Sequence, residues 1–175
     1  MVGTARRRGR RIRPVLRDGA GVGCRLVLAG VWLYAGGSKL TDLDGSVRAV
    51  KAYDLLPPAL AEWVGAALPF VEVGLGLLLL VGLATRVAAA GSVLLIAAFV
   101  VGIASAWARG LEIDCGCFGS GGELAAGESP TYLADLLRDL ALLAMAGLLW
   151  WRPVTRWSAD RWLAGERPDA PPSAA

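Results

Sequence analysis

The sequence has 175 residues, of which 55% are hydrophobic, with a mean hydropathy of +0.53 and a formal net charge of +3. It contains three cysteines and no histidine, which leaves a zinc site short of its usual ligands. The apolar residues are concentrated in four blocks, which are separated by charges and by Pro and Gly. This composition indicates a membrane protein and argues against an ordinary soluble domain.

Four segments meet the need of a membrane-spanning helix for about 20 largely apolar residues. They are Ala20 to Leu40, Trp63 to Leu83, Val87 to Trp107, and Asp139 to Trp151 preceded by Tyr132 to Arg138 as its entry turns. The third consists of 21 uncharged residues in a row, whereas helices of soluble bundles show a polar face. The first carries Arg25 and Lys39 near its ends, where long side chains can reach the headgroups. We predict an all-α, polytopic membrane protein with a bundle of four transmembrane helices.

The distribution of basic residues predicts the orientation, because cytoplasmic flanks collect Lys and Arg. With both termini inside, twelve basic residues are cytoplasmic and four lie outside, while Arg25 and Arg138 lie within helical segments, which accounts for all 18. The twelve are Arg6, Arg7, Arg8, Arg10, Arg11, Arg13, Arg17, Arg86, Arg152, Arg156, Arg161 and Arg167, and the four are Lys39, Arg48, Lys51 and Arg109. We therefore predict a multi-pass protein of the cell membrane with cytoplasmic termini and an outer loop at residues 108–131.

The chain divides into three parts on this interpretation. Residues 1–19 form a basic cytoplasmic segment, residues 20–151 form the four-helix membrane domain, and residues 152–175 form a cytoplasmic tail that is predicted to be disordered. An Arg-rich N-terminal segment can bind nucleic acid, but directly before a spanning helix it is more typical of a flank that touches anionic lipid. The predicted partner is the lipid bilayer, with no nucleic acid.

Two of the three cysteines lie one residue apart in Asp114-Cys115-Gly116-Cys117-Phe118-Gly119, within the predicted outer loop. A redox pair, a metal site and a static structural bridge are all open. Zinc normally takes four ligands, and only three nearby carboxylates accompany the two thiols. A bridge between Cys115 and Cys117 closes a very small ring, and strained, exposed bridges are the easily reduced ones. We favour a redox pair, with Cys115 and Cys117 as candidate catalytic residues and Cys24 as a packing residue.

Glu72 is the third candidate site residue. It lies about nine residues into the second segment, which places it roughly 14 Å below the surface and close to the bilayer midplane. An ionisable group at that depth is costly, so it marks a functional or helix-locking residue with a partner. The candidate partners are Tyr34, Ser38, Arg25 and Lys39. Glu72 is expected either to relay a proton or to tie helices together.

Several short motifs follow one another in a recognisable order. They are Arg25, Gly36-Gly37-Ser38-Lys39-Leu40, Tyr53-Asp54-Leu55-Leu56-Pro57, Pro69-Phe70-Val71-Glu72, Cys115-Gly116-Cys117-Phe118-Gly119 and Arg138-Asp139. This ordered set resembles the MauE/DoxX family of four-helix membrane proteins over about Arg25 to Trp151. The resemblance implies a role in methylamine utilisation or in membrane-associated oxidoreductase systems, where MauE is associated with a thioredoxin-like partner in forming the disulfides of the methylamine dehydrogenase small subunit.

Taken together, the residues and the resemblance predict an integral membrane redox-associated protein that exchanges thiols and disulfides at the outer membrane face. Its expected protein partner is a thioredoxin-like or other redox protein outside the membrane. The sequence identifies no cofactor and leaves open whether the protein is an enzyme. The alternative is a non-enzymatic membrane scaffold or a small-solute permease, in which the cysteines only staple the loop.

Overall fold

The computed structural model describes residues 4–116, 121–124, 129–151 and 159–163 of the chain. Its elements are α1 (Thr4–Leu40), α2 (Leu43–Ala52), α3 (Pro58–Val81), α4 (Thr85–Ala108), β1 (Ile113–Asp114), β2 (Gly122–Glu123), α5 (Tyr132–Trp151) and α6 (Ala159–Leu163). The two strands form a short antiparallel ladder, with Ile113 opposite Glu123. Because every other described element is a helix, the predicted all-α fold is confirmed.

Three helices of the described chain are long and apolar enough to cross a membrane. These spans are Gly19–Leu40 within α1, Pro58–Val81 and Thr85–Ala108, which agree with the first three predicted segments. The fourth helix, α5, has the predicted bounds but carries Asp135, Arg138 and Asp139 within its 20 residues. The chain is thus a multi-pass membrane protein, and membrane crossing by α5 stays a prediction.

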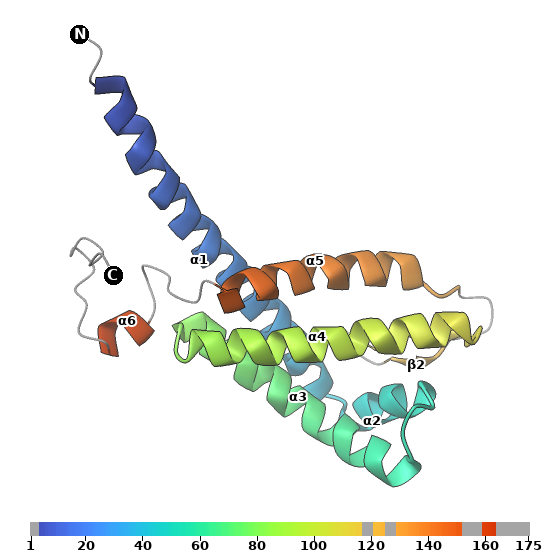
Figure 1. Ribbon diagram of the computed structural model, residues 1–175. Helices are drawn as coiled ribbons and strands as arrows, with labels where there is room; N and C mark the ends of the chain where they lie inside the picture. Colours follow the sequence, from blue (N-terminus) through green and yellow to red (C-terminus); the bar gives the residue numbers. More distant parts are fainter. Residues whose placement is uncertain (1–3, 117–120, 125–128, 152–158, 164–175) are drawn as a thin grey trace.

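The four long helices pack into one bundle. Figure 1 shows α5 lying along α4 and α1 crossing behind these two helices, and α1 packs against α3 and α5. The core between the helices is apolar, with Leu28, Leu79 and Leu149 fully buried. Trp32 Nε1 of α1 donates to Ser92 Oγ of α4 at 2.9 Å within this core. Among the described residues, the bundle also buries charged side chains, including those of Lys39, Glu72 and Asp139.

Close contact between α1 and α3 depends on two glycines. A Cβ atom added to Gly36 would lie 2.8 Å from the carbonyl oxygen of Pro69, and one added to Gly76 would lie 2.8 Å from Leu33 Cγ. Distances this short leave no room for a side chain. In membranes, where lipid is as apolar as the helices, such close packing is a main source of helix association.

A proline inside α3 explains how α2 is attached. Pro69 has no N–H, so the carbonyl oxygen of Gly65, four residues earlier, loses its intrahelical donor. The hydroxyl of Ser46 in α2 donates to that oxygen at 2.8 Å, and both groups are buried. A break in the hydrogen bonding of α3 thus becomes the point where α2 docks.

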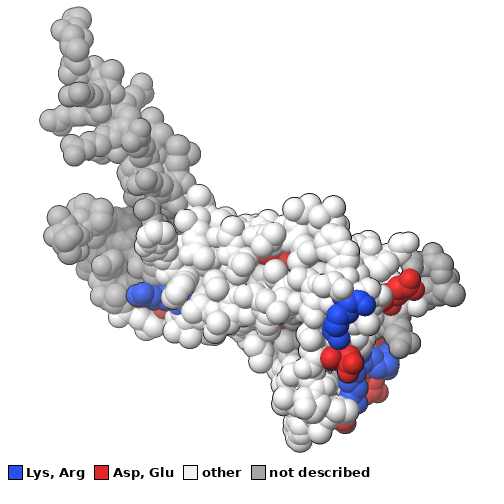
Figure 2. All heavy atoms as spheres, turned by 45° about the vertical axis from the view of Figure 1, so that its right-hand side comes forward, with Lys and Arg blue, Asp and Glu red and all other residues white. Residues whose placement is uncertain are grey.

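The described surface is apolar over most of the bundle and carries most of its charged side chains at one end. Figure 2 shows blue and red side chains gathered at the end that holds α2 and the start of α3, next to a broad uncharged band. Exposed ion pairs occur there between Arg48 and Asp42 and between Lys51 and Glu62, each at 3.4 Å. An uncharged band of this kind is consistent with contact to the lipid bilayer.

At the other end of the bundle, Asp160 in α6 caps the N-terminus of α4. Its carboxylate accepts hydrogen bonds from the backbone N–H groups of Ala84 at 2.7 Å and Thr85 at 2.9 Å. These donors have no partner within their own helix, so Asp160 acts as a cap supplied from a distant part of the chain. The rest of the tail predicted to be disordered lies outside the described residues.

We expect Asp160→Ala to lower the stability of the protein by about 1 kcal/mol at neutral pH, the usual cost of losing a helix cap. Burial by itself raises the pKa of Asp160, but the hydrogen bonds from Thr85 and Ala84 and the charge of Arg25 outweigh it, so the pKa lies below its ordinary value. The stabilisation is therefore present above the unfolded pKa of about 3.9 and is lost as the pH falls through the folded pKa.

Thermal unfolding in detergent, followed by circular dichroism, measures this difference. The gap between Asp160→Ala and the unmodified protein should narrow from pH 7 to about pH 3. Glu62→Ala, which removes an exposed carboxylate from a surface pair, is the control and should show neither effect. An equal gap at both pH values would mean that the carboxylate charge contributes nothing.

Candidate functional site

A buried ion pair joins α1 to α3. Lys39 Nζ lies 2.5 Å from Glu72 Oε1, and the two side chains are 2% and 0% exposed. Of the partners that the sequence offered for Glu72, the structure selects Lys39. The prediction that Lys39 and Arg25 reach out to the headgroups is wrong, because both side chains are buried in the bundle.

The ion pair follows from the close packing of α1 on α3. Gly36 lies directly against Glu72, since a Cβ atom at Gly36 would lie 2.9 Å from Glu72 Cβ. Lys39 is one turn further along the same helix face, so its side chain meets the carboxylate. The ring of Phe99 in α4 lies under the ammonium, with 5.5 Å between Nζ and the ring centroid. This contact adds a cation–π attraction.

A second charged group lies on α5. Arg138 Nη1 donates to Asp135 Oδ1 at 2.8 Å, and Arg138 Nε donates to Asp139 Oδ1 at 2.9 Å. Asp135 also accepts from the hydroxyl of Thr131 at 2.9 Å. The spacing of three and four residues places Asp135, Arg138 and Asp139 on one side of the helix. Two carboxylates therefore hold the guanidinium in a defined orientation.

The remaining face of Arg138 meets the cysteine loop. Arg138 Nη2 lies 3.8 Å from Cys115 Sγ and donates to it. The backbone of Cys115 is held as well, because Tyr53 at the end of α2 donates its hydroxyl hydrogen to the Cys115 carbonyl oxygen at 2.9 Å. Cys115 is thus fixed at its backbone and at its sulfur by two residues that are remote in sequence.

The path of the loop depends on glycine and on one tyrosine. Gly116 has φ of +65°, and a Cβ atom there would lie 2.8 Å from Ala49 Cβ, so a larger residue would be strained and crowded. Tyr132, at the start of α5, donates to the carbonyl oxygen of Leu111 at 2.5 Å and accepts from the backbone N–H of Ile113 at 3.1 Å. These contacts bring the loop against α2 and α5.

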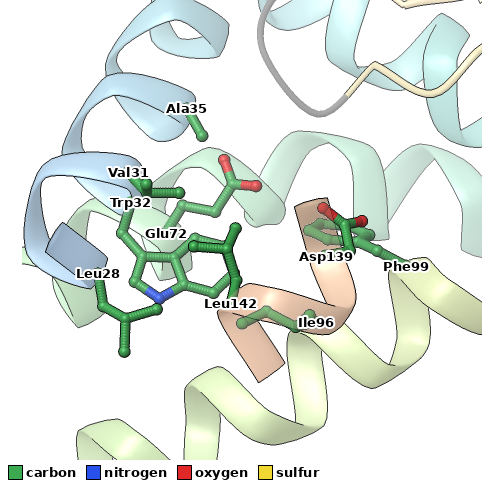
Figure 3. A pocket seen from close by; sticks show the side chains of 9 residues that line it. All are labelled: Leu28, Val31, Trp32, Ala35, Glu72, Ile96, Phe99, Asp139 and Leu142. Atoms are coloured by element: carbon green, nitrogen blue, oxygen red, sulfur yellow. The ribbon is translucent and has the colours of Figure 1, made fainter. Parts of the chain in front are cut away.

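A small cavity lies between the two charged groups. Its volume is about 20 Å³, and it is lined by Leu28, Val31, Trp32, Ala35, Glu72, Ile96, Phe99, Asp139 and Leu142. Figure 3 shows Glu72 and Asp139 entering it from two different helices, with their carboxyl groups above the side chains of Trp32 and Leu142. The cavity therefore connects the Lys39 ion pair with the α5 group.

The structure places two of the three predicted site residues in this region. Glu72 lies at the cavity, and Cys115 lies beyond the α5 group that faces the same cavity. Cys117 lies outside the described residues. Cys24 is a half-buried thiol beside the apolar core, which agrees with a packing role. Within the described part of the chain, no group of three or more His, Cys, Asp and Glu residues could hold a metal ion.

Sequence reasoning missed the α5 residues as members of the site. Arg138 and Asp139 formed part of the recognised motif set, but Arg138 was assigned only to a helical segment. The available signal was the presence of three charges at helical spacing in an otherwise apolar helix. Buried charges in such a helix call for partners, and Asp135, Arg138 and Asp139 supply them for one another.

The chain matches the model of a known protein family. The model of the family described as methylamine utilisation protein MauE matches residues 17–152. The match covers every described residue of the two charged groups, Cys115 and the cavity. It confirms the MauE part of the resemblance, while the DoxX part stays a prediction. Comparisons with curated proteins and with solved structures gave no match.

Proposed function

Because this chain belongs to the family of the methylamine utilisation protein MauE, we propose that it serves methylamine utilisation through disulfide exchange at the outer face of the cell membrane. Cys115 and Cys117 are the exchanging pair, and the partner is a thioredoxin-like or other redox protein outside the membrane. The family supports a membrane protein linked to methylamine utilisation. The chemistry at the cysteines is our inference from the residues that surround Cys115.

The contact between Arg138 and Cys115 carries this proposal. The thiolate is the reactive form of cysteine, and a neighbouring cation favours it over the neutral thiol. Arg138 lies 3.8 Å from the sulfur and is held there by Asp135 and Asp139. A cysteine that only stapled the loop would have no need of an oriented cation. The contact also favours Cys115 over Cys117 as the attacking residue, a choice that the sequence left open.

The exchange proceeds through a mixed disulfide between Cys115 and the partner. The Cys115 thiolate attacks one sulfur of the partner's disulfide, forming a mixed disulfide and releasing the partner's other sulfur as a thiolate. Cys117, as a thiolate, then attacks the Cys115 sulfur and releases the second partner sulfur. The partner's disulfide is thereby reduced to two thiols, and the pair Cys115 and Cys117 is oxidised. Run in reverse, the same steps transfer a disulfide to the partner.

The predicted orientation supports the same proposal. With twelve basic residues inside and four outside, the cysteine loop faces the outer compartment, where disulfides form and persist. In this arrangement Glu72 lies within the bundle, away from the exchanging sulfurs, and supports the helices or relays a proton. The loop end of the molecule would be the surface that the redox partner meets.

The test is to trap the mixed disulfide in cells. In a Cys117→Ser variant the resolving thiol is absent, so we expect a covalent, reductant-sensitive adduct between Cys115 and a partner protein, identified by mass spectrometry. Cys115→Ser should give no adduct, and Cys24→Ser is the matched control that should behave like the unmodified protein. If neither single variant forms an adduct, and the variant with both loop cysteines replaced still supports disulfide-dependent methylamine utilisation, the proposal is wrong and a scaffold or permease takes its place.

A further inference from the structure

Two buried carboxyl oxygens face the cavity between Glu72 and Asp139. Glu72 Oε1 is paired with Lys39, and Asp139 Oδ1 is paired with Arg138. The second oxygens, Glu72 Oε2 and Asp139 Oδ2, accept no hydrogen bond from any residue of the described chain. Both residues are almost fully buried, at 0% and 3% exposed. Buried oxygens of this kind need a hydrogen-bond donor, because losing water without one is costly.

The charges around the cavity do not balance within the described residues. The cations are Lys39 from α1 and Arg138 from α5, whereas the carboxyl groups are Glu72 from α3 with Asp135 and Asp139 from α5. Helix α4 contributes only the apolar side chains of Ile96 and Phe99 to the cavity wall. Outside the cavity, Cys115 can add only a further negative charge. Full ionisation would leave one excess negative charge in a low-dielectric interior, which one bound proton removes.

We propose that the cavity holds one water molecule and that Glu72 and Asp139 share one proton through it. The protonated carboxyl group donates to the water, and the water donates to the carboxylate on the other side. Both orphan oxygens then have partners, and the buried group is neutral overall. The volume of about 20 Å³ is sufficient for one water molecule, which needs a cavity of about 10–15 Å³ measured in this way and at least two polar partners.

This site has a consequence for the bundle that does not depend on the cysteines. Without the water, Lys39 and Glu72 tie α1 to α3, while Asp135, Arg138 and Asp139 form a separate group on α5. With it, the two groups become one hydrogen-bonded network across three helices. Through Arg138 the network reaches Cys115, so it is also a proton-holding site next to the cysteine loop.

Infrared spectroscopy of the purified protein at neutral pH tests the proposal, since a protonated carboxyl group absorbs apart from a carboxylate. We expect a protonated carboxyl band in which one component shifts when glutamate is labelled with ¹³C at its side-chain carboxyl and another shifts when aspartate is so labelled, because the shared proton resides on each side chain in part of the molecules. Glu72→Gln and Asp139→Asn should each remove or shift this band, whereas Glu62→Gln, at an exposed carboxylate, should leave it unchanged. The isotope experiment uses the unmodified chain, so it gives a result even if a variant fails to fold.

Ala35→Val tests the role of water. Ala35 lines the cavity and is 3% exposed, so the two added methyl groups would occupy the space of the water. The band should move to the position of a weakly hydrogen-bonded carboxyl group. No band at neutral pH, a band that responds to only one of the two labels, or no shift in Ala35→Val would each overturn the proposal. The same measurement is repeated with both loop cysteines replaced by serine. This variant cannot exchange disulfides, so its infrared spectrum tests the shared proton independently of the proposed function.

Discussion

Lys39→Met is expected to cost the protein about 3–5 kcal/mol of stability, since it removes one partner of a buried ion pair and leaves the other without compensation. Glu72 is fully buried, so bulk solvent cannot solvate its carboxylate in place of the ammonium that lies 2.5 Å away. Thermal unfolding in detergent, followed by circular dichroism, measures the loss.

A second variant separates the ion pair from packing. Lys39→Met combined with Glu72→Met replaces the pair by apolar side chains and should recover most of the loss. Lys51→Met, which breaks an exposed pair with Glu62 at 3.4 Å, is the control and should change stability by about 1 kcal/mol or less. If Lys39→Met were as stable as Lys51→Met, the ammonium could not be the counter-charge of Glu72.

Arg138→Gln is expected to slow alkylation of Cys115 at neutral pH by about tenfold or more. A hydrogen bond to a charged group contributes about 1.5–3 kcal/mol, and about 1.4 kcal/mol corresponds to a factor of ten. The substitution removes the cation that lies 3.8 Å from the sulfur and leaves a shorter, neutral polar side chain. The rate of reaction with iodoacetamide is measured in a background with Cys24 and Cys117 replaced by serine, so that only Cys115 reacts.

The pH dependence of the Cys115 alkylation rate shows whether a change in rate comes from the thiolate or from access to the loop. In Arg138→Gln the rate should rise towards alkaline pH and approach that of the parent, because the thiolate forms there without help from a cation. Arg48→Gln, which removes an exposed cation beside Asp42, is the control and should leave the profile unchanged. A uniform decrease at every pH would point to altered access to the loop, and an unchanged profile would show that Arg138 does not favour the thiolate.

The ends of the apolar helices were largely predictable from local sequence, but α1 begins at Thr4, within the segment that is predicted from the sequence to be a separate basic part of the chain. Long uncharged runs such as Val87 to Trp107 leave few alternatives to a spanning helix, and α5 begins and ends at the predicted residues, Tyr132 and Trp151. The order of the short motifs predicted membership of the MauE family, and the match over residues 17–152 confirms it. The depth of Glu72 in an apolar segment already indicated a buried charge with a partner.

The partners themselves depended on how the helices pack. Which of four groups meets Glu72 depends on the contact of Gly36 with α3, which turns Lys39 into the bundle although its sequence position suits a headgroup contact. Arg138 contacts Cys115, which lies 23 positions earlier in the chain, because Tyr53 holds the loop that contains Cys115. The hydrophobic pattern of the sequence indicates whether a residue lies in an apolar helix, because helix formation and apolar character depend on neighbouring residues in the chain. The direction of a long charged side chain depends on the free energy of contacts across helices, and only the tertiary structure decides it.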